Sequence, residues 1–244
     1  MACIVELKNI FYSAQNKKLA KGVSYEFEEG KTTALIGPSG CGKSTMLKLA
    51  AGLFAPDEGE VLFRGKDIFR MNRLENLAFR REAAVVFQDS ALWANQNLFQ
   101  ILDLPLRLHF PSMTLKQRER RIESVVAEVG YKKDLGIRPS GLSMGEQKLI
   151  AFARALMCRP MLLYLDEWTE SLDETASQRL IDMVKKMQSE GVSVIFVSHD
   201  VRIVRALADF VIMILGGQIF IRLTREQIDA DDFLVEFIEK GMES

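Results

Sequence analysis

A glycine-rich segment near the N-terminus has the residue types and spacing of a phosphate-binding loop. It consists of Gly37, Pro38, Ser39, Gly40, Cys41, Gly42, Lys43, Ser44 and Thr45. Its glycines allow successive backbone N–H groups to turn towards an anion without interference from a Cβ atom. Lys43 is expected to reach the β- and γ-phosphates and assist the chemistry there, and the Ser44 hydroxyl is expected to ligate Mg²⁺. The segment therefore predicts a nucleoside triphosphate site.

The residues on both sides of this loop predict the elements that would position it. An apolar run at residues 33–36 predicts a buried strand, and residues 46–51 predict a helix. Strand, loop and helix in this order are the context that a phosphate loop requires. The helix N-terminus adds partial positive charge at the same point. This context disfavours the alternative, a glycine-rich loop with an incidental lysine.

Five further motifs follow the phosphate loop along the chain. They are Val85-Val86-Phe87-Gln88, Leu142-Ser143-Met144-Gly145-Glu146-Gln147, an apolar strand that ends in Asp166-Glu167, Ser171-Leu172-Asp173, and Ser198-His199-Asp200. Each motif alone is modest evidence. Their order and spacing resemble those of the ATP-binding-cassette (ABC) ATPases, and the resemblance covers nearly the whole chain. It implies that the nucleotide is ATP, bound with Mg²⁺.

The resemblance assigns catalytic roles to residues at the ends of predicted strands. Asp166 would hold Mg²⁺ through water, and Glu167 would be the general base that polarises the attacking water. His199 would contact the γ-phosphate. Gln88 would reach Mg²⁺ or the attacking water and link the nucleotide to the helical region that follows. The alternatives are a solvated boundary for the two acids, a structural histidine, and a glutamine that merely ends a strand.

The segment around Ser143 has both a local and a family interpretation. Ser143 with Glu146 three residues later forms a capping box, which explains both residues without a functional role. The resemblance adds that this helix N-terminus points at the nucleotide held by a second copy of the chain, so that Ser143, Gly145, Glu146 and Asp173 would contact ATP across a head-to-tail dimer. Met144 replaces the usual glycine, and we expect slowed or altered chemistry at most.

Two other positions depart from the family pattern. The family commonly stacks adenine on an aromatic residue that an ungapped comparison places at Ala14. Tyr12 would face the same side of an extended strand, so it either stacks on adenine or packs within the protein. Trp168 replaces the proline that usually follows the catalytic glutamate, and its role is not explained by the sequence.

Alternating strand and helix patterns, together with the resemblance, predict an α/β fold. We expect a P-loop NTPase core of ABC type with an antiparallel β subdomain and a helical subdomain insertion, forming one ABC ATPase domain over residues 1–244. The expected parts are a nucleotide-binding core at 1–88 and 159–225, a helical subdomain at 89–158 and a C-terminal helical tail at 226–244. The capping pair Thr114 and Gln117 predicts one helix of the insertion. The tail carries an apolar face, made of Phe233, Leu234, Phe237 and Ile238, that docks on the same chain or on a partner.

Composition restricts the classes of partner and compartment. The formal net charge of −1 gives no global attraction to nucleic acid, so we expect no nucleic acid partner. No apolar stretch approaches the roughly 20 residues of a membrane span, and the N-terminus lacks the pattern of a signal peptide. The three cysteines lack metal-ligand spacing and suit a reducing cytoplasm. The resemblance adds that this cytoplasmic protein would be peripheral on the inner face of the cell membrane, held there by its permease.

A finer resemblance concerns the permease and its cargo. The residues after Gln88, with Ala91-Leu92-Trp93, Asn97, Phe99 and Pro105-Leu106-Arg107-Leu108-His109, resemble the ATPases of Mce/Mla-type lipid transport systems. The alternatives are the ATPase of another small-solute importer, a soluble non-transport ABC ATPase, and a nucleotide-sensing module. We expect the segment from Asp89 to about Phe110 to dock a membrane permease through Trp93, Leu98 and Phe99, unless these side chains pack inside the helical subdomain.

Overall fold

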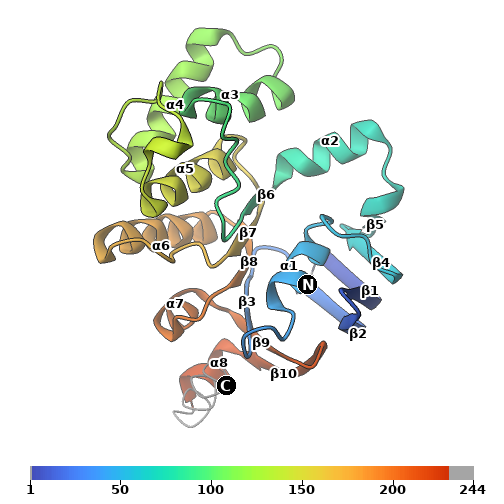
Figure 1. Cartoon of the computed structure of the whole chain (residues 1–244). Helices are drawn as coiled ribbons and strands as arrows, with labels where there is room; N and C mark the ends of the chain where they lie inside the picture. The colour runs from blue at the N-terminus through green and yellow to red at the C-terminus, as the bar shows by residue number, and fades with distance from the viewer. Residues whose placement is uncertain (1, 231–244) are drawn as a thin grey trace.

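A six-stranded sheet forms the centre of the computed structural model, which describes residues 2–230 (Figure 1). Its strands, in spatial order, are β10 (Gln218–Thr224), β9 (Phe210–Leu215), β3 (Thr32–Ile36), β8 (Ser193–Val197), β7 (Leu162–Asp166) and β6 (Ala83–Val86). All neighbours pair in parallel except β10, which is antiparallel to β9. The predicted apolar tail face at Phe233, Leu234, Phe237 and Ile238 lies outside the described residues.

Continuous apolar sequence explains the central strands. Every residue of β3, β7 and β8 is buried. Parallel strands covered by helices on both faces carry such unbroken apolar runs. In parallel strands the carboxyl ends meet at one edge of the sheet, where ligands of open α/β sheets commonly bind. The residues that follow these strands are therefore brought together by the fold.

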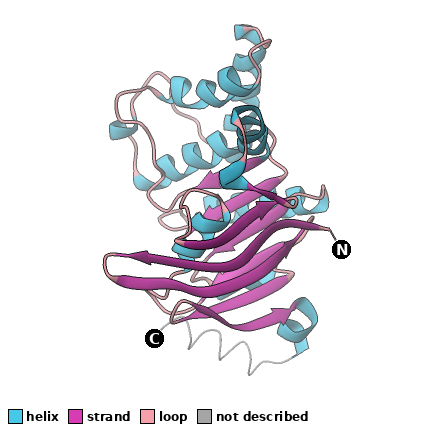
Figure 2. Ribbon diagram, turned by 90° about the vertical axis from the view of Figure 1, so that its right-hand side faces the viewer, coloured by secondary structure: helices cyan, strands magenta, loops and turns pink. Residues whose placement is uncertain are grey.

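A second, antiparallel sheet lies beside the first, as predicted (Figure 2). It contains β2 (Lys17–Glu28), β1 (Cys3–Ala14), β4 (Glu58–Phe63) and β5 (Lys66–Asp67) in that order. The hairpin of β1 and β2 is longer than the short apolar runs in the sequence indicated. Both strands alternate buried and exposed residues over part of their length, which is typical of a sheet with one face on the core.

Helices form the remaining layers. They are α1 (Lys43–Ala50), α2 (Arg73–Glu82), α3 (Leu98–His109), α4 (Leu115–Val129), α5 (Met144–Leu156), α6 (Glu174–Ser189), α7 (Val201–Leu207) and α8 (Arg225–Ala230), with short 3₁₀ helices at Ile68–Arg70 and Pro139–Gly141. Figure 1 shows α3, α4 and α5 grouped at one end of the molecule, away from the antiparallel sheet. This group is the predicted helical insertion. Thr114 and Gln117 cap α4 as expected.

Helix α2 was not predicted from the sequence. Asn72 and Glu75 form a capping box at its start, and this pair was the available sequence signal. The Arg80 side chain fixes α2 to the end of α1 by donating to the carbonyls of Ala51 and Gly52, both at 2.7 Å. A basic residue thus satisfies helix-terminal carbonyls that would otherwise lack partners.

The apolar residues expected at the permease-docking surface do not share one environment. Leu98 is 0% exposed and belongs to the main core, so its assignment to an exposed docking surface is wrong. The Phe99 side chain is half-buried and packs against the same core. Trp93 is 44% exposed and lies over the Arg154 guanidinium, 5.5 Å from the ring centroid. Leu98 is buried because it begins α3 on the face that packs into the helical layer.

Candidate nucleotide-binding site

The phosphate loop leaves the end of β3 in a conformation that only glycine adopts easily. Gly37 has a φ of 140°, and a Cβ atom there would lie 2.3 Å from the carbonyl oxygen of Ile214. Gly42, at the N-terminal end of α1, has a φ of 108° and would place a Cβ 3.0 Å from the Leu19 carbonyl oxygen. Close approach of neighbouring backbone therefore fixes both ends of the loop.

The Lys43 ammonium lies inside the curve of this loop. Its Nζ donates to the carbonyl oxygens of Gly37 at 2.7 Å and Pro38 at 3.0 Å. The side chain is buried, and it begins α1, so a cation and a helix N-terminus occupy one place. This combination suits the phosphates of a nucleotide.

Ser44 and Asp166 meet beside the loop, as expected for residues that hold Mg²⁺. The Ser44 hydroxyl donates to Asp166 Oδ1 at 2.8 Å, across 122 residues of sequence. Burial raises the pKa of Asp166, while the bond from Ser44 and nearby lysines oppose that shift. Within residues 2–230 there is no group of three or more His, Cys, Asp or Glu side chains able to hold a metal ion. A hydroxyl and a carboxylate fit Mg²⁺, which usually takes its other ligands from water and substrate phosphates.

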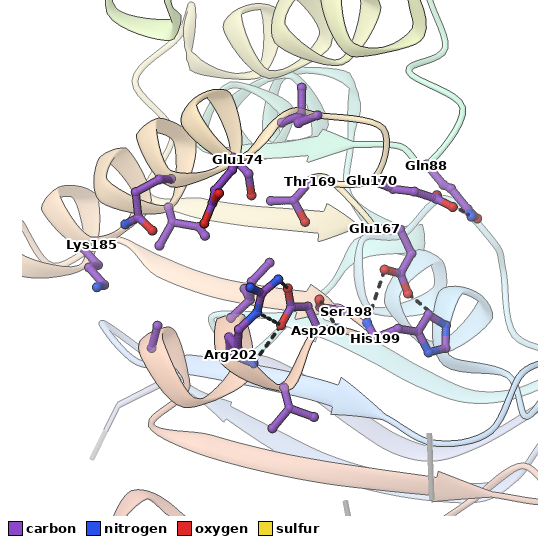
Figure 3. Close-up of a pocket in the computed structure, with 17 residues that line it drawn as sticks. Gln88, Glu167, Thr169, Glu170, Glu174, Lys185, Ser198, His199, Asp200 and Arg202 are labelled. Atoms are coloured by element: carbon purple, nitrogen blue, oxygen red, sulfur yellow. Dashed lines mark hydrogen bonds and ion pairs between the residues drawn. The ribbon is translucent and has the colours of Figure 1, made fainter. Parts of the chain in front are cut away.

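Glu167 and His199 face each other across the ends of β7 and β8 (Figure 3). His199 Nε2 lies 3.1 Å from Glu167 Oε1, and the His199 backbone N–H donates to Oε2 at 3.4 Å. Burial raises the pKa of Glu167 to about 7 and lowers that of His199. Both shifts disfavour the charged form of the side chain, because burial is the largest cause of each.

Gln88 reaches the same region from the end of β6. Its Nε2 donates to Glu170 Oε2 at 3.1 Å, as Figure 3 shows. Gln88, Glu167, Glu170 and His199 all line one cavity of about 850 Å³. Sequence reasoning missed Glu170, because it lies between two recognised motifs and no local pattern marks it. The fold thus brings together the predicted catalytic residues at one edge of the central sheet.

The predicted second half of the site lies on α5. Ser143 caps this helix and forms the expected capping box with Glu146. A Cβ on Gly145 would lie 2.9 Å from the Ser171 carbonyl oxygen, so the helix start packs closely on the Ser171 turn. Met144 is 72% exposed and therefore does not crowd its own chain. Asp173 caps α6, its Oδ1 accepting from Ala176 N–H at 2.8 Å. Contact of these residues with ATP stays a prediction.

Tyr12 packs within the protein. Its ring stacks on Phe54, with the ring centroids 5.4 Å apart and the planes at 11°. This contact favours packing over the adenine-stacking alternative. A cavity of about 410 Å³ beside Gly40 and Cys41 is lined also by lysines of the β1–β2 hairpin, and none of its lining residues is aromatic.

The chain is similar to known transporter ATPases over most of its length. Residues 20–170, more than half of the chain, match the family described as ABC transporter. The nickel import ATP-binding proteins NikE of Shigella flexneri serotype 5b and of Brucella abortus are 36% and 34% identical, over 84% and 93% of this chain and 78% and 86% of theirs. YejF of Escherichia coli, an uncharacterized ABC transporter ATP-binding protein, is 37% identical over 82% of this chain, which spans only 39% of YejF.

Solved structures agree with the sequence relatives. The dimeric post-hydrolysis structure of the ATP-binding cassette MJ0796, bound to ADP and Pi, superposes with a TM-score of 0.84 at 27% identity, covering 91% of this chain and 99% of that one. CbiO1 of Clostridium perfringens, part of the cbiONQ transporter complex, shares the fold with a TM-score of 0.77 at 24% identity, covering 98% and 96%. No helix among residues 2–230 is long and apolar enough to span a membrane. From the matched family, the relatives and the fold together, we conclude that the chain belongs to the ABC transporter family and is an ATP-binding cassette ATPase.

Proposed function

We propose that Lys43, Asp166, Glu167 and His199 hydrolyse ATP to power a membrane permease. One observation carries this proposal: these four residues come from three separate segments, which lie at the ends of three neighbouring strands. Lys43 follows β3, the acids end β7, and His199 follows β8. Each side chain supplies a group that phosphoryl transfer uses: a cation, a metal-binding carboxylate, a base and a hydrogen-bonding imidazole.

In the proposed reaction, water attacks the γ-phosphorus of ATP. A bond forms between the water oxygen and the γ-phosphorus, the bond to the β–γ bridging oxygen breaks, and the products are ADP and inorganic phosphate. The ionised Glu167 carboxylate accepts the water proton, and His199 orients that carboxylate and the γ-phosphate. Lys43 and the loop N–H groups bind the phosphates. Mg²⁺, held by Ser44 and Asp166, would neutralise phosphate charge.

A second copy of the chain would complete the site. The α5 N-terminus, at Ser143 and Gly145, would face the ATP bound to the partner copy, with the exposed Met144 at the junction. A helix N-terminus provides N–H groups and partial positive charge for an anion. The dimeric MJ0796 structures support this arrangement.

The segment from Asp89 to about Phe110 would dock the permease, which would hold the protein at the inner face of the membrane. Trp93 remains a suitable anchor because it is partly exposed and lies on Arg154. Leu104 and Leu108, one helical turn apart on α3, are also exposed. We propose lipid as the cargo, on the resemblance of this segment to Mce/Mla-type ATPases. Nickel is a second candidate, because nickel import names the NikE relatives.

The ATPase role is tested by phosphate release from the purified protein. Lys43→Ala removes the cation from the loop and should reduce turnover to background. Lys31→Ala is the matched control, since Lys31 is an exposed lysine just before the opposite end of β3. It should keep wild-type turnover. Full activity of Lys43→Ala would contradict the proposed site. Reconstitution with a membrane permease that co-purifies with this protein, assayed with labelled phospholipid and with Ni²⁺, then distinguishes the two cargoes.

A further inference from the structure

A buried lysine links the Gln88 segment to the Glu167 segment, which belong to two separate sequence motifs. Lys148 lies on α5 and is 3% exposed. Its Nζ donates to the backbone carbonyl oxygen of Gln88 at 2.5 Å and to that of Glu167 at 3.2 Å. These carbonyls belong to segments 79 residues apart, at the ends of the neighbouring strands β6 and β7.

Burial of the Lys148 ammonium costs free energy that an apolar side chain at this position would not. Burying an ammonium is unfavourable unless it is hydrogen-bonded and near opposite charge. Burial lowers the pKa of Lys148, and the carboxylates of Glu170, Asp166, Asp89 and Glu167 oppose that shift. Those acids supply the compensating charge, so the lysine is held among the groups of the site rather than on a solvent-exposed face.

The backbone at Glu167 is strained, so a hydrogen bond to its carbonyl oxygen helps to hold it in place. Glu167 has a φ of 43°, a left-handed conformation that non-glycine residues adopt at an energetic cost. The next residue, Trp168, is fully buried and stacks on Phe152 of α5, with the ring centroids 5.6 Å apart. Helix α5 therefore contacts the Glu167 turn at two points, through an ammonium and through an aromatic ring.

We propose that Lys148 is a positioning residue for ATP hydrolysis. By bonding both carbonyls, it fixes the backbone of Gln88 relative to that of Glu167, and so fixes the side chain of each with respect to the attacking water. Because Lys148 lies on the helix that Ser143 caps, it also connects that helix start to the catalytic carboxylate. This inference rests on the role proposed above for Glu167.

The test separates donor, charge and packing at this position. Lys148→Met keeps the length of the side chain but removes the donors, whereas Lys148→Arg keeps donors and charge. Arg154→Met is the matched control on the same helix: Arg154 donates to the carbonyls of Ala91 and Ser90 and to neither Gln88 nor Glu167. For each variant, kcat and KM for ATP are measured below the melting temperature determined by circular dichroism.

We expect Lys148→Met to lower kcat by about tenfold or more, because small displacements of catalytic groups are that costly. KM should stay within about threefold of wild type, because the phosphate loop is untouched. Lys148→Arg should recover most of kcat, and Arg154→Met should change kcat by less than about threefold even if it melts earlier. If Lys148→Met does not fold, Lys148→Ala, which leaves room for water on both carbonyls, is judged by the same criteria.

Three results would overturn the inference. One is a kcat within about twofold of wild type for the folded variant that lacks donors. Another is an equal loss of kcat in Arg154→Met, which would indicate general loosening of α5. The last is failure of both Lys148→Met and Lys148→Ala to fold while Arg154→Met folds. Glu167→Gln, assayed in parallel, reports on the proposed function itself: retained turnover there refutes the base, independently of Lys148.

Discussion

The ionisation of Glu167 should set the pH dependence of hydrolysis. A general base acts when it has lost its proton, and burial raises the pKa of this carboxyl from 4.5 to about 7. With a pKa of about 7, about 10% of the carboxyl is ionised at pH 6 and about 90% at pH 8. We therefore expect kcat/KM for Mg·ATP, which reports ionisation in the free protein, to rise about tenfold between these pH values.

An unperturbed glutamate gives a different result, which makes the experiment decisive. Its carboxyl would already be almost fully ionised at pH 6, so kcat/KM would be nearly flat above that pH. Phosphate release is measured with Mg·ATP well below KM from pH 5.5 to 8.5, with Glu174→Gln as the control. This variant removes an acid from the same cavity but not the base, and it should keep the wild-type profile. A flat wild-type profile between pH 6 and 8 would refute the argument.

The same pKa shift predicts a change in stability. The unfolded glutamate ionises near pH 4.5 and the folded one near 7, so the folded state loses relative stability as the pH rises between these values. The full loss is about 3 kcal/mol, since one pKa unit corresponds to about 1.4 kcal/mol. Glu167→Gln cannot ionise. Urea unfolding should therefore find it more stable than wild type by up to about 3 kcal/mol at pH 8 but not at pH 4. Equal differences at both pH values would count against the shift.

Three further predictions concern the dimer, the docking segment and the core beneath it. Glu167→Gln should form a dimer with saturating Mg·ATP, seen by size exclusion with light scattering, because ATP stays trapped between two copies; a strict monomer at high protein concentration would contradict the shared site. Trp93→Ala should keep basal ATPase activity and melting temperature while weakening permease binding by about tenfold or more. Leu98→Ala should instead destabilise the fold by about 2–5 kcal/mol, because Leu98 is a core residue. Normal permease binding by Trp93→Ala would place the docking surface elsewhere.

Local sequence patterns predicted the parts of this structure that local physics determines. The phosphate loop was recognisable because strand, glycines, lysine and helix are consecutive, and α4 was recognisable from its capping pair. The approach of Ser44 to Asp166 was implied by the resemblance to the ABC ATPases, which assigns both residues to Mg²⁺. The expected helical insertion and antiparallel sheet are both present.

The features that the sequence did not predict depend on contacts between distant segments. Leu98 follows a polar stretch and reads equally well as an exposed anchor or as a core residue, and only the packing of α3 decides between them. Lys148 looks like an ordinary helix lysine in the sequence. Its role depends on two carbonyls that are 60 and 19 residues away. The position of Trp168 could not be predicted for the same reason, since its stacking partner Phe152 lies on α5.

We expect Glu167 to act as the base of an ATPase site built on Lys43 and Asp166. The most direct measurement compares ATP binding and phosphate release in wild type and Glu167→Gln. We predict that the variant binds Mg·ATP within about threefold of wild-type affinity but releases phosphate at least about a hundredfold more slowly. Phosphate release by the variant at the wild-type rate would show that Glu167 is not the base.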